Sequence, residues 1–160
     1  MVRVAVVYES MFGNTRAIAE AVCEGLRVSD PELQVAVVQA SEATPDEMED
    51  VDLLVVGAPT HLGRMPSRLS RKQFTQASGV RELLDALPTA PPGRKAAAFD
   101  TDFGMPLSGS AARPISRRLR RHGYTILAKP TGFIVEKSKG PLRADELERA
   151  RTWGAGLIQR

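Results

Sequence analysis

The stretch VRVAVVYESMFGNTRAIAEAV, residues 2–22, contains the change of pattern that decides the fold. Its first part, VRVAVVY (2–8), is short and rich in valine, as is typical of a β-strand buried on both faces. From Thr15 onward the apolar residues recur every three or four positions, which predicts an amphipathic helix that ends before Ser29. A buried strand followed directly by a helix is the first unit of a parallel α/β sheet.

The same alternation continues to the end of the chain. Further strands are predicted at 33–39, 52–57, 95–100 and 124–135, and further helices near 44–47, 80–87, 111–122 and 142–157. Pro130 interrupts the last of these strands. Five alternations predict a parallel sheet with helices on both faces, which binds ligands beyond the carboxyl ends of its strands. The 160 residues, 1–160, fit one domain of common size.

Composition excludes several classes of protein. A hydrophobic content of 42% and a charged content of 26% are ordinary for a globular protein. No apolar run reaches the roughly 18 residues that a membrane-spanning helix needs, and the N-terminus lacks the layout of a signal peptide. Cys23 is the only cysteine, so the chain has no internal disulfide and fits a reducing compartment. We expect a cytoplasmic protein.

The chain is mildly basic, with a net charge of +3, and its cations are clustered. The two clusters are Arg64, Arg68, Arg71 and Lys72, and Arg117, Arg118, Arg120 and Arg121. Such runs are either solvated faces or a docking surface for an acidic partner or nucleic acid. Nucleic acid is the less favoured partner, because no aromatic residues for base stacking interleave with the second cluster.

The loop between the first strand and the first helix, residues 8–15, has the composition of an anion site. A helix N-terminus presents unpaired N–H groups and the positive end of the helix dipole. Ser10, Asn14 and Thr15 add polar side chains, and Gly13 allows a tight turn. Plain helix capping by Ser10 or Asn14 is the alternative that these residues leave open. The glycine-rich motifs of nucleoside-triphosphate and dinucleotide sites are absent.

The run Val6-Val7-Tyr8-x-Ser10-x-x-Gly13-x-Thr15-x-x-x-Ala19-x-x-Val22 resembles the signature of the flavodoxin family at every defined position. The resemblance implies a three-layer α/β flavodoxin-like fold, with a five-stranded parallel sheet in the order 2-1-3-4-5 and helices on both faces. It also implies that FMN is the cofactor. The residues expected to surround the FMN phosphate are Ser10, Met11, Phe12, Gly13, Asn14 and Thr15.

The same resemblance places the flavin ring against the loops that follow the third and fourth strands. The residues expected around the ring are Pro59, Thr60, His61, Leu62, Gly63, Thr101, Asp102, Phe103 and Gly104. Phe103 is the candidate for stacking on the ring, and Gly104 would permit close approach of the backbone. The third-strand loop has no aromatic residue, which leaves Leu62 or Met65 to cover a ring face.

Ionisable residues in these loops suggest little chemistry beyond that of the flavin. His61 is either a group that tunes the flavin or a solvent-exposed loop histidine. Asp100 and Asp102 have no histidine or cysteine partners nearby in the sequence, so we expect no metal site. No catalytic residue is assigned, because flavin chemistry belongs mostly to the cofactor.

Three functions remain open. The leading one is electron transfer by bound FMN, with an acidic redox partner protein or an anionic substrate meeting Arg64, Arg68, Arg71 and Lys72. The second is NAD(P)H-dependent quinone reduction, because GAPTHLGRM (57–65) resembles the G-x-P-T-x-x-G-x-M loop of the tryptophan-repressor-binding-protein family of flavodoxin-like quinone reductases. The third is a flavin-free binding module, in which residues 10–15 only cap a helix.

Overall fold

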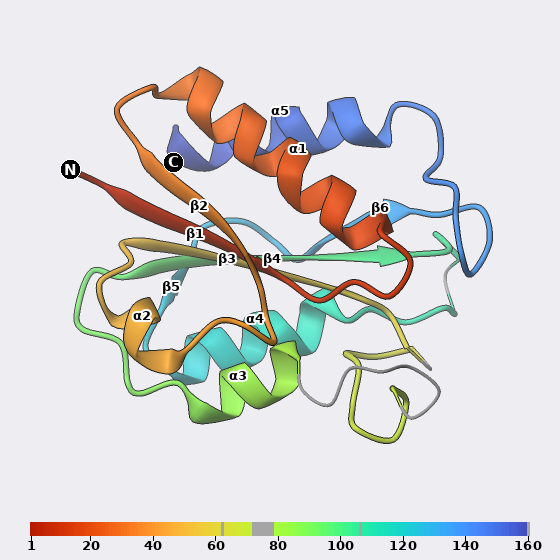
Figure 1. Ribbon diagram of the computed structural model, residues 1–160, viewed down its shortest axis with the longest axis horizontal. Helices are drawn as coiled ribbons and strands as arrows, with labels where there is room; N and C mark the ends of the chain where they lie inside the picture. Colours follow the sequence, from red (N-terminus) through yellow and green to blue (C-terminus); the bar gives the residue numbers. More distant parts are fainter. Residues whose placement is uncertain (62, 72–78, 106, 160) are drawn as a thin grey trace.

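A parallel sheet forms the middle layer of the computed structural model, which describes residues 1–61, 63–71, 79–105 and 107–159 (Figure 1). The strands are β1 (Arg3–Tyr8), β2 (Gln34–Gln39), β3 (Leu53–Pro59), β4 (Lys95–Asp102), β5 (Thr125–Ile126) and β6 (Thr131–Ile134). They are arranged in the order β2-β1-β3-β4-β5, and β6 also pairs with β4. The predicted α/β fold and strand order 2-1-3-4-5 are confirmed.

The predicted last strand, 124–135 with an interruption at Pro130, consists of two separate short strands, so the sheet has six strands rather than five. β5 pairs with the start of β4, through Lys95 and Ala96, and β6 pairs with its end, from Phe99 to Asp102. Pro130 lies between the two short strands and has no N–H group to donate to a sheet. The fifth position of the sheet is therefore filled by two strands that share β4 as their neighbour.

Helices cover both faces of the sheet (Figure 1). α1 (Asn14–Ser29) and α5 (Glu146–Ile158) lie on one face, and α2 (Pro45–Glu49), α3 (Val80–Ala86) and α4 (Ala112–Arg121) lie on the other. Each face has its own apolar cluster, which explains why the central strands are apolar at successive positions rather than at alternate ones. Along the described part of the chain, no helix is long and apolar enough to cross a membrane.

Cys23 and Trp153 serve the packing of the face covered by α1 and α5. Burial raises the pKa of the Cys23 thiol to about 12, so it stays protonated at neutral pH. The Trp153 ring lies edge-on to Phe99 and Phe133, with centroid separations of 6.0 and 6.1 Å. Cys23 is buried in the core, and the partly buried Trp153 packs against it.

Candidate functional site

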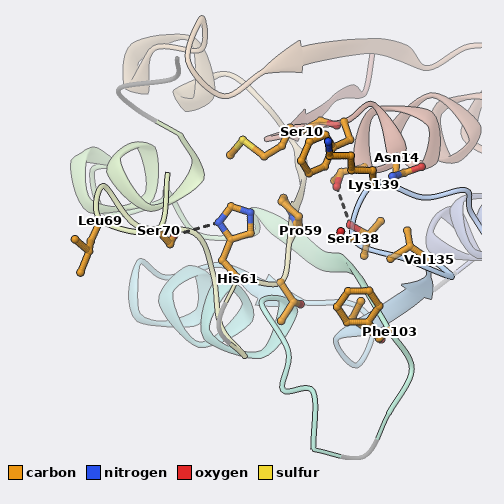
Figure 2. A pocket seen from close by; sticks show the side chains of 16 residues that line it. Ser10, Asn14, Pro59, His61, Leu69, Ser70, Phe103, Val135, Ser138 and Lys139 are labelled. Atoms are coloured by element: carbon orange, nitrogen blue, oxygen red, sulfur yellow. Dashed lines mark hydrogen bonds between the residues drawn. The ribbon is translucent and has the colours of Figure 1, made fainter. Parts of the chain in front are cut away.

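A cavity of about 740 Å³ lies at the carboxyl ends of β1, β3 and β4. Loops that are far apart in the sequence meet around it: residues 10–15, 59–61, 69–70, 101–103 and 135–139 all contribute side chains (Figure 2). This is the edge at which a parallel α/β sheet is expected to bind its ligand. The volume lies within the range of small-molecule sites, which is roughly 300–1,000 Å³.

Most of the residues predicted from the sequence come together at this cavity. Those that line it are Ser10, Met11, Phe12, Asn14, Thr15, Pro59, Thr60, His61, Thr101, Asp102 and Phe103. Gly13, Gly63 and Gly104 do not line it, and Leu62 lies outside the residues that the structure describes. For all of these residues, contact with a cofactor remains a prediction.

One end of the cavity is formed by the N-terminus of α1. Gly13 occupies the N-cap position with a φ of 91°, and no side chain caps the helix. The Ser10 Oγ instead accepts a hydrogen bond from the backbone N–H of Gly13, at 3.1 Å. The alternative in which Ser10 or Asn14 caps the helix is therefore wrong. Uncapped N–H groups and the helix dipole make this end suited to an anion.

A hydrogen bond between two threonine side chains joins the first loop to the end of β4. The Oγ1 atoms of Thr15 and Thr101 lie 2.8 Å apart, and both residues are buried and line the cavity. Each hydroxyl can donate one hydrogen and also accept, so the pair retains capacity toward a ligand. The contact fixes the position of the α1 N-terminus relative to the loop that carries Phe103.

The loop after β6 also lines the cavity, which the sequence analysis did not anticipate. Val135, Ser138 and Lys139 line it, as do Leu69 and Ser70 from the loop after β3. The Lys139 ammonium lies 5.8 Å from the centre of the Phe12 ring, so a cation lies beside the loop at residues 10–15. A parallel sheet predicts this position for the loop after β6, because the loop follows a strand parallel to β4 and hence leaves the sheet at the same edge.

The opposite end of the cavity contains the residues expected around a ring. Phe103, Pro59 and His61 all line the cavity (Figure 2), and Phe103 has 44% of its surface exposed. Met65 was a candidate for covering a ring face, but it is only 1% exposed and packs in the core beneath the sheet. Gly104 has a φ of 70°, and a side chain there would collide with Ile134 of β6.

His61 is half-buried rather than surrounded by solvent. Its Nδ1 lies 3.1 Å from the Ser70 Oγ, as the dashed line in Figure 2 shows. Burial lowers the pKa of His61 below its ordinary value, and the positive charge of Arg71 lowers it further. The cavity therefore contains a neutral imidazole at physiological pH, which can hydrogen-bond without adding charge.

Behind the cavity wall lies a buried carboxyl group, Asp100. Its Oδ2 accepts hydrogen bonds from the Ser110 Oγ at 2.7 Å and from the Ala112 N–H at 3.0 Å. Burial, and secondly the neighbouring Asp102, raises its pKa to about 8. The group is thus mostly protonated at pH 7 and anchors the start of α4. No metal cluster of His, Cys, Asp and Glu occurs among the residues described.

The first cluster of cations is not a continuous surface. Arg71 is 1% exposed, and its Nε donates to the Glu9 Oε2 at 2.6 Å. It is therefore no part of an exposed docking surface, which corrects the prediction made from the sequence. Lys72 lies outside the described residues, and Arg64 and Arg68 are exposed. The sequence pattern could not distinguish them, because only the fold brings Glu9 next to Arg71.

Comparison with known proteins decides the family. The model of the flavodoxin family matches residues 6–91, which is more than half of the chain. The chain belongs to the flavodoxin family. Members of this family bind FMN and act in electron transfer, so FMN is the cofactor of this flavodoxin-like protein. The cavity has a volume suited to such a cofactor, and the uncapped N-terminus of α1 forms one end of it.

Relatives cover the whole of this flavodoxin-like chain. Two similar proteins are named NAD(P)H dehydrogenase (quinone). The protein of Gluconacetobacter diazotrophicus is 29% identical, and the match covers 99% of this chain and 83% of the relative. The protein of Archaeoglobus fulgidus is 28% identical, and the match covers 99% of this chain and 97% of the relative. Among solved structures, Flavodoxin 1 of Bacillus cereus has a TM-score of 0.76 at 20% identity, covering 99% of this chain and 98% of its own. An archaeal flavodoxin has a TM-score of 0.72 at 23% identity, covering 99% and 97%. These two structures share the fold.

Proposed function

We propose that the 740 Å³ cavity binds FMN and that the bound FMN passes electrons between redox partners. The phosphate lies at residues 10–15, and the flavin ring lies between residues 59–61 and 101–103. The observation that supports this most strongly is the polarity of the cavity. An uncapped helix N-terminus and Lys139 stand at one end, and Phe103 with Pro59 stands at the other. FMN has the same polarity, with a phosphate at one end and an aromatic ring at the other.

At the phosphate end, the chain supplies donors and one positive charge. The backbone N–H groups that begin α1 point along the helix axis toward its N-terminus, and Ser10, Asn14 and Thr15 add side-chain groups. Lys139 contributes an ammonium from a different loop, which packs on the first one: a side chain at Gly140 would collide with Asn14. Hydrogen bonds to a charged group are worth about 1.5–3 kcal/mol each.

At the ring end, the chain supplies an apolar rim and a neutral donor or acceptor. Leu69 and Phe103 line the cavity and are exposed, by 77% and 44%. Exposed apolar side chains grouped in this way are typical of a contact surface. Together with the exposed Arg64 and Arg68, they fit an acidic redox partner or an anionic substrate.

We also propose that the protein acts in the cytoplasm.

Replacing Thr15 by alanine is expected to weaken FMN binding by roughly tenfold to a hundredfold and to leave riboflavin binding nearly unchanged, because riboflavin has no phosphate. Both affinities are measured by quenching of flavin fluorescence. Thr89→Ala, in an exposed loop, is the matched control. A Thr15→Ala protein that binds FMN as tightly as wild type would contradict the placement of the phosphate. A wild-type protein that binds neither flavin would contradict the proposal as a whole.

A second function, NAD(P)H-dependent quinone reduction, is favoured by the sequence relatives, which are named NAD(P)H dehydrogenase (quinone). Anaerobic addition of NADPH to the FMN-loaded protein separates the two. For an electron carrier we expect that the visible flavin absorbance persists over minutes and bleaches only when a separate reductase is added. Bleaching within seconds by NADPH alone would show that the chain is itself a reductase, and an added quinone would then restore the absorbance.

A further inference from the structure

We propose that a second, smaller pocket beside the FMN cavity binds a phosphate group carried by a small-molecule electron donor or acceptor. This inference rests on the proposed function, because it concerns the molecule that meets the flavin. The pocket has a volume of about 250 Å³. His61, Leu69 and Ser70 line both cavities, whereas Arg64, Ser67 and Arg81 line only the smaller one. A molecule anchored by a phosphate in the smaller pocket therefore has its other end at the ring end of the larger one.

Two arginines, Arg64 and Arg81, line the smaller pocket. Arg81 donates from Nε to the Pro66 carbonyl at 3.1 Å and from Nη2 to the Met65 carbonyl at 2.8 Å. These partners are neutral, and within the described part of the chain neither Arg64 nor Arg81 forms an ion pair.

The described charges around Arg81 compensate its positive surroundings only in part. Burial lowers the pKa of Arg81, and the positive charges of Arg118 and Arg64 lower it further, against the opposing effects of Asp85 and Glu82. Both of those carboxylates already have partners, since Asp85 pairs with Arg118 and Glu82 pairs with Arg71. An anion bound between Arg64 and Arg81 would relieve this repulsion, which is the physical reason for expecting one.

The geometry favours phosphate over a larger anionic surface. A pocket of this size admits one small group but not a folded partner. Guanidinium groups bind phosphate oxygens through two parallel hydrogen bonds, which a pair of arginines can provide from two sides. The loop that carries the pocket is also held in place, because the backbone N–H of Ser67 donates to the Ser70 Oγ at 2.8 Å and that of Ser70 to the Ser67 Oγ at 3.2 Å.

The test titrates FMN-loaded protein with inorganic pyrophosphate at low ionic strength. Binding is measured by calorimetry and by the change in the side-chain NMR signal of the Arg81 Nε–H. Loading with FMN fills the first anion site, so that only the second remains. Arg64→Gln is expected to weaken pyrophosphate binding about tenfold. Arg117→Gln, which removes the same charge from an exposed site on α4, is expected to change it less than twofold. Glutarate, a dicarboxylate of similar length, is expected to bind more weakly than pyrophosphate.

Several results would overturn the inference. Equal pyrophosphate affinity in wild type and Arg64→Gln would show that the pocket does not bind the anion. Equal losses in Arg64→Gln and Arg117→Gln would show general charge attraction instead, and tighter binding of glutarate would show a carboxylate site. If the protein fails to retain FMN, the proposed function fails, and the same comparison of Arg64→Gln with wild type is made on flavin-free protein. Unchanged FMN affinity in Arg64→Gln is expected throughout.

Discussion

Replacing Arg71 by alanine is expected to lower the free energy of unfolding by about 3–5 kcal/mol, because it leaves a buried carboxylate without its counter-ion. Glu9 and Arg71 are each only 1% exposed. The guanidinium donates to both oxygens of Glu9, at 2.6 and 3.2 Å, and also pairs with Glu82. The Val80 N–H donates to the same Glu9 carboxylate, at 3.0 Å, so the pair joins the end of β1 to the start of α3.

Urea denaturation monitored by circular dichroism measures this loss. Arg68→Ala, at an exposed position of the same loop, is the matched control and is expected to change stability by less than about 0.5 kcal/mol. A double variant, Glu9→Gln with Arg71→Met, removes both charges and should lose less than Arg71→Ala alone. Equal stability of Arg71→Ala and Arg68→Ala would show that the buried ion pair contributes nothing net.

Replacing Asp100 by asparagine is expected to abolish a decline of stability between about pH 4 and pH 8. The pKa of Asp100 is raised from an ordinary value of about 4 to about 8 by burial, so in this range the folded state holds a proton that the unfolded state has lost. The free energy of unfolding of the wild type therefore falls as the pH rises, by up to about 1.4 kcal/mol per pH unit. Above the folded-state pKa this slope ends.

Asparagine is the informative substitution because it resembles the protonated acid. Its oxygen can still accept from the Ser110 Oγ and the Ala112 N–H, and its NH₂ group can face Asp102. Arg149 of α5, which donates to the Gly132 carbonyl, is the cation near this pair. Denaturation curves at several pH values measure the slope. Asp100→Ala loses the acceptors and should be less stable than Asp100→Asn throughout. An unchanged slope in Asp100→Asn would contradict the assignment of the proton.

Comparison of two predicted loops shows how far the sequence can be used. The loop at residues 10–15 is predicted to be an anion site on local evidence: a buried strand, a glycine and a helix start follow one another directly in the chain. Lys139 was missed because it is more than a hundred residues away from that loop and its neighbours in the sequence carry no motif. Its place beside Phe12 depends on β6 pairing in parallel with β4.

The sequence by itself determined the succession of strands and helices along the chain and the family, and it predicted an anion site at residues 10–15, because periodicity and the first loop motif are properties of contiguous residues. Only the tertiary structure decided which ionisable groups are exposed. Arg64 and Arg71 look alike in the sequence, yet one is exposed at a pocket and the other is buried against Glu9. Asp100 holds a proton for the same reason: burial depends on which distant segments cover a side chain, and that is set by packing.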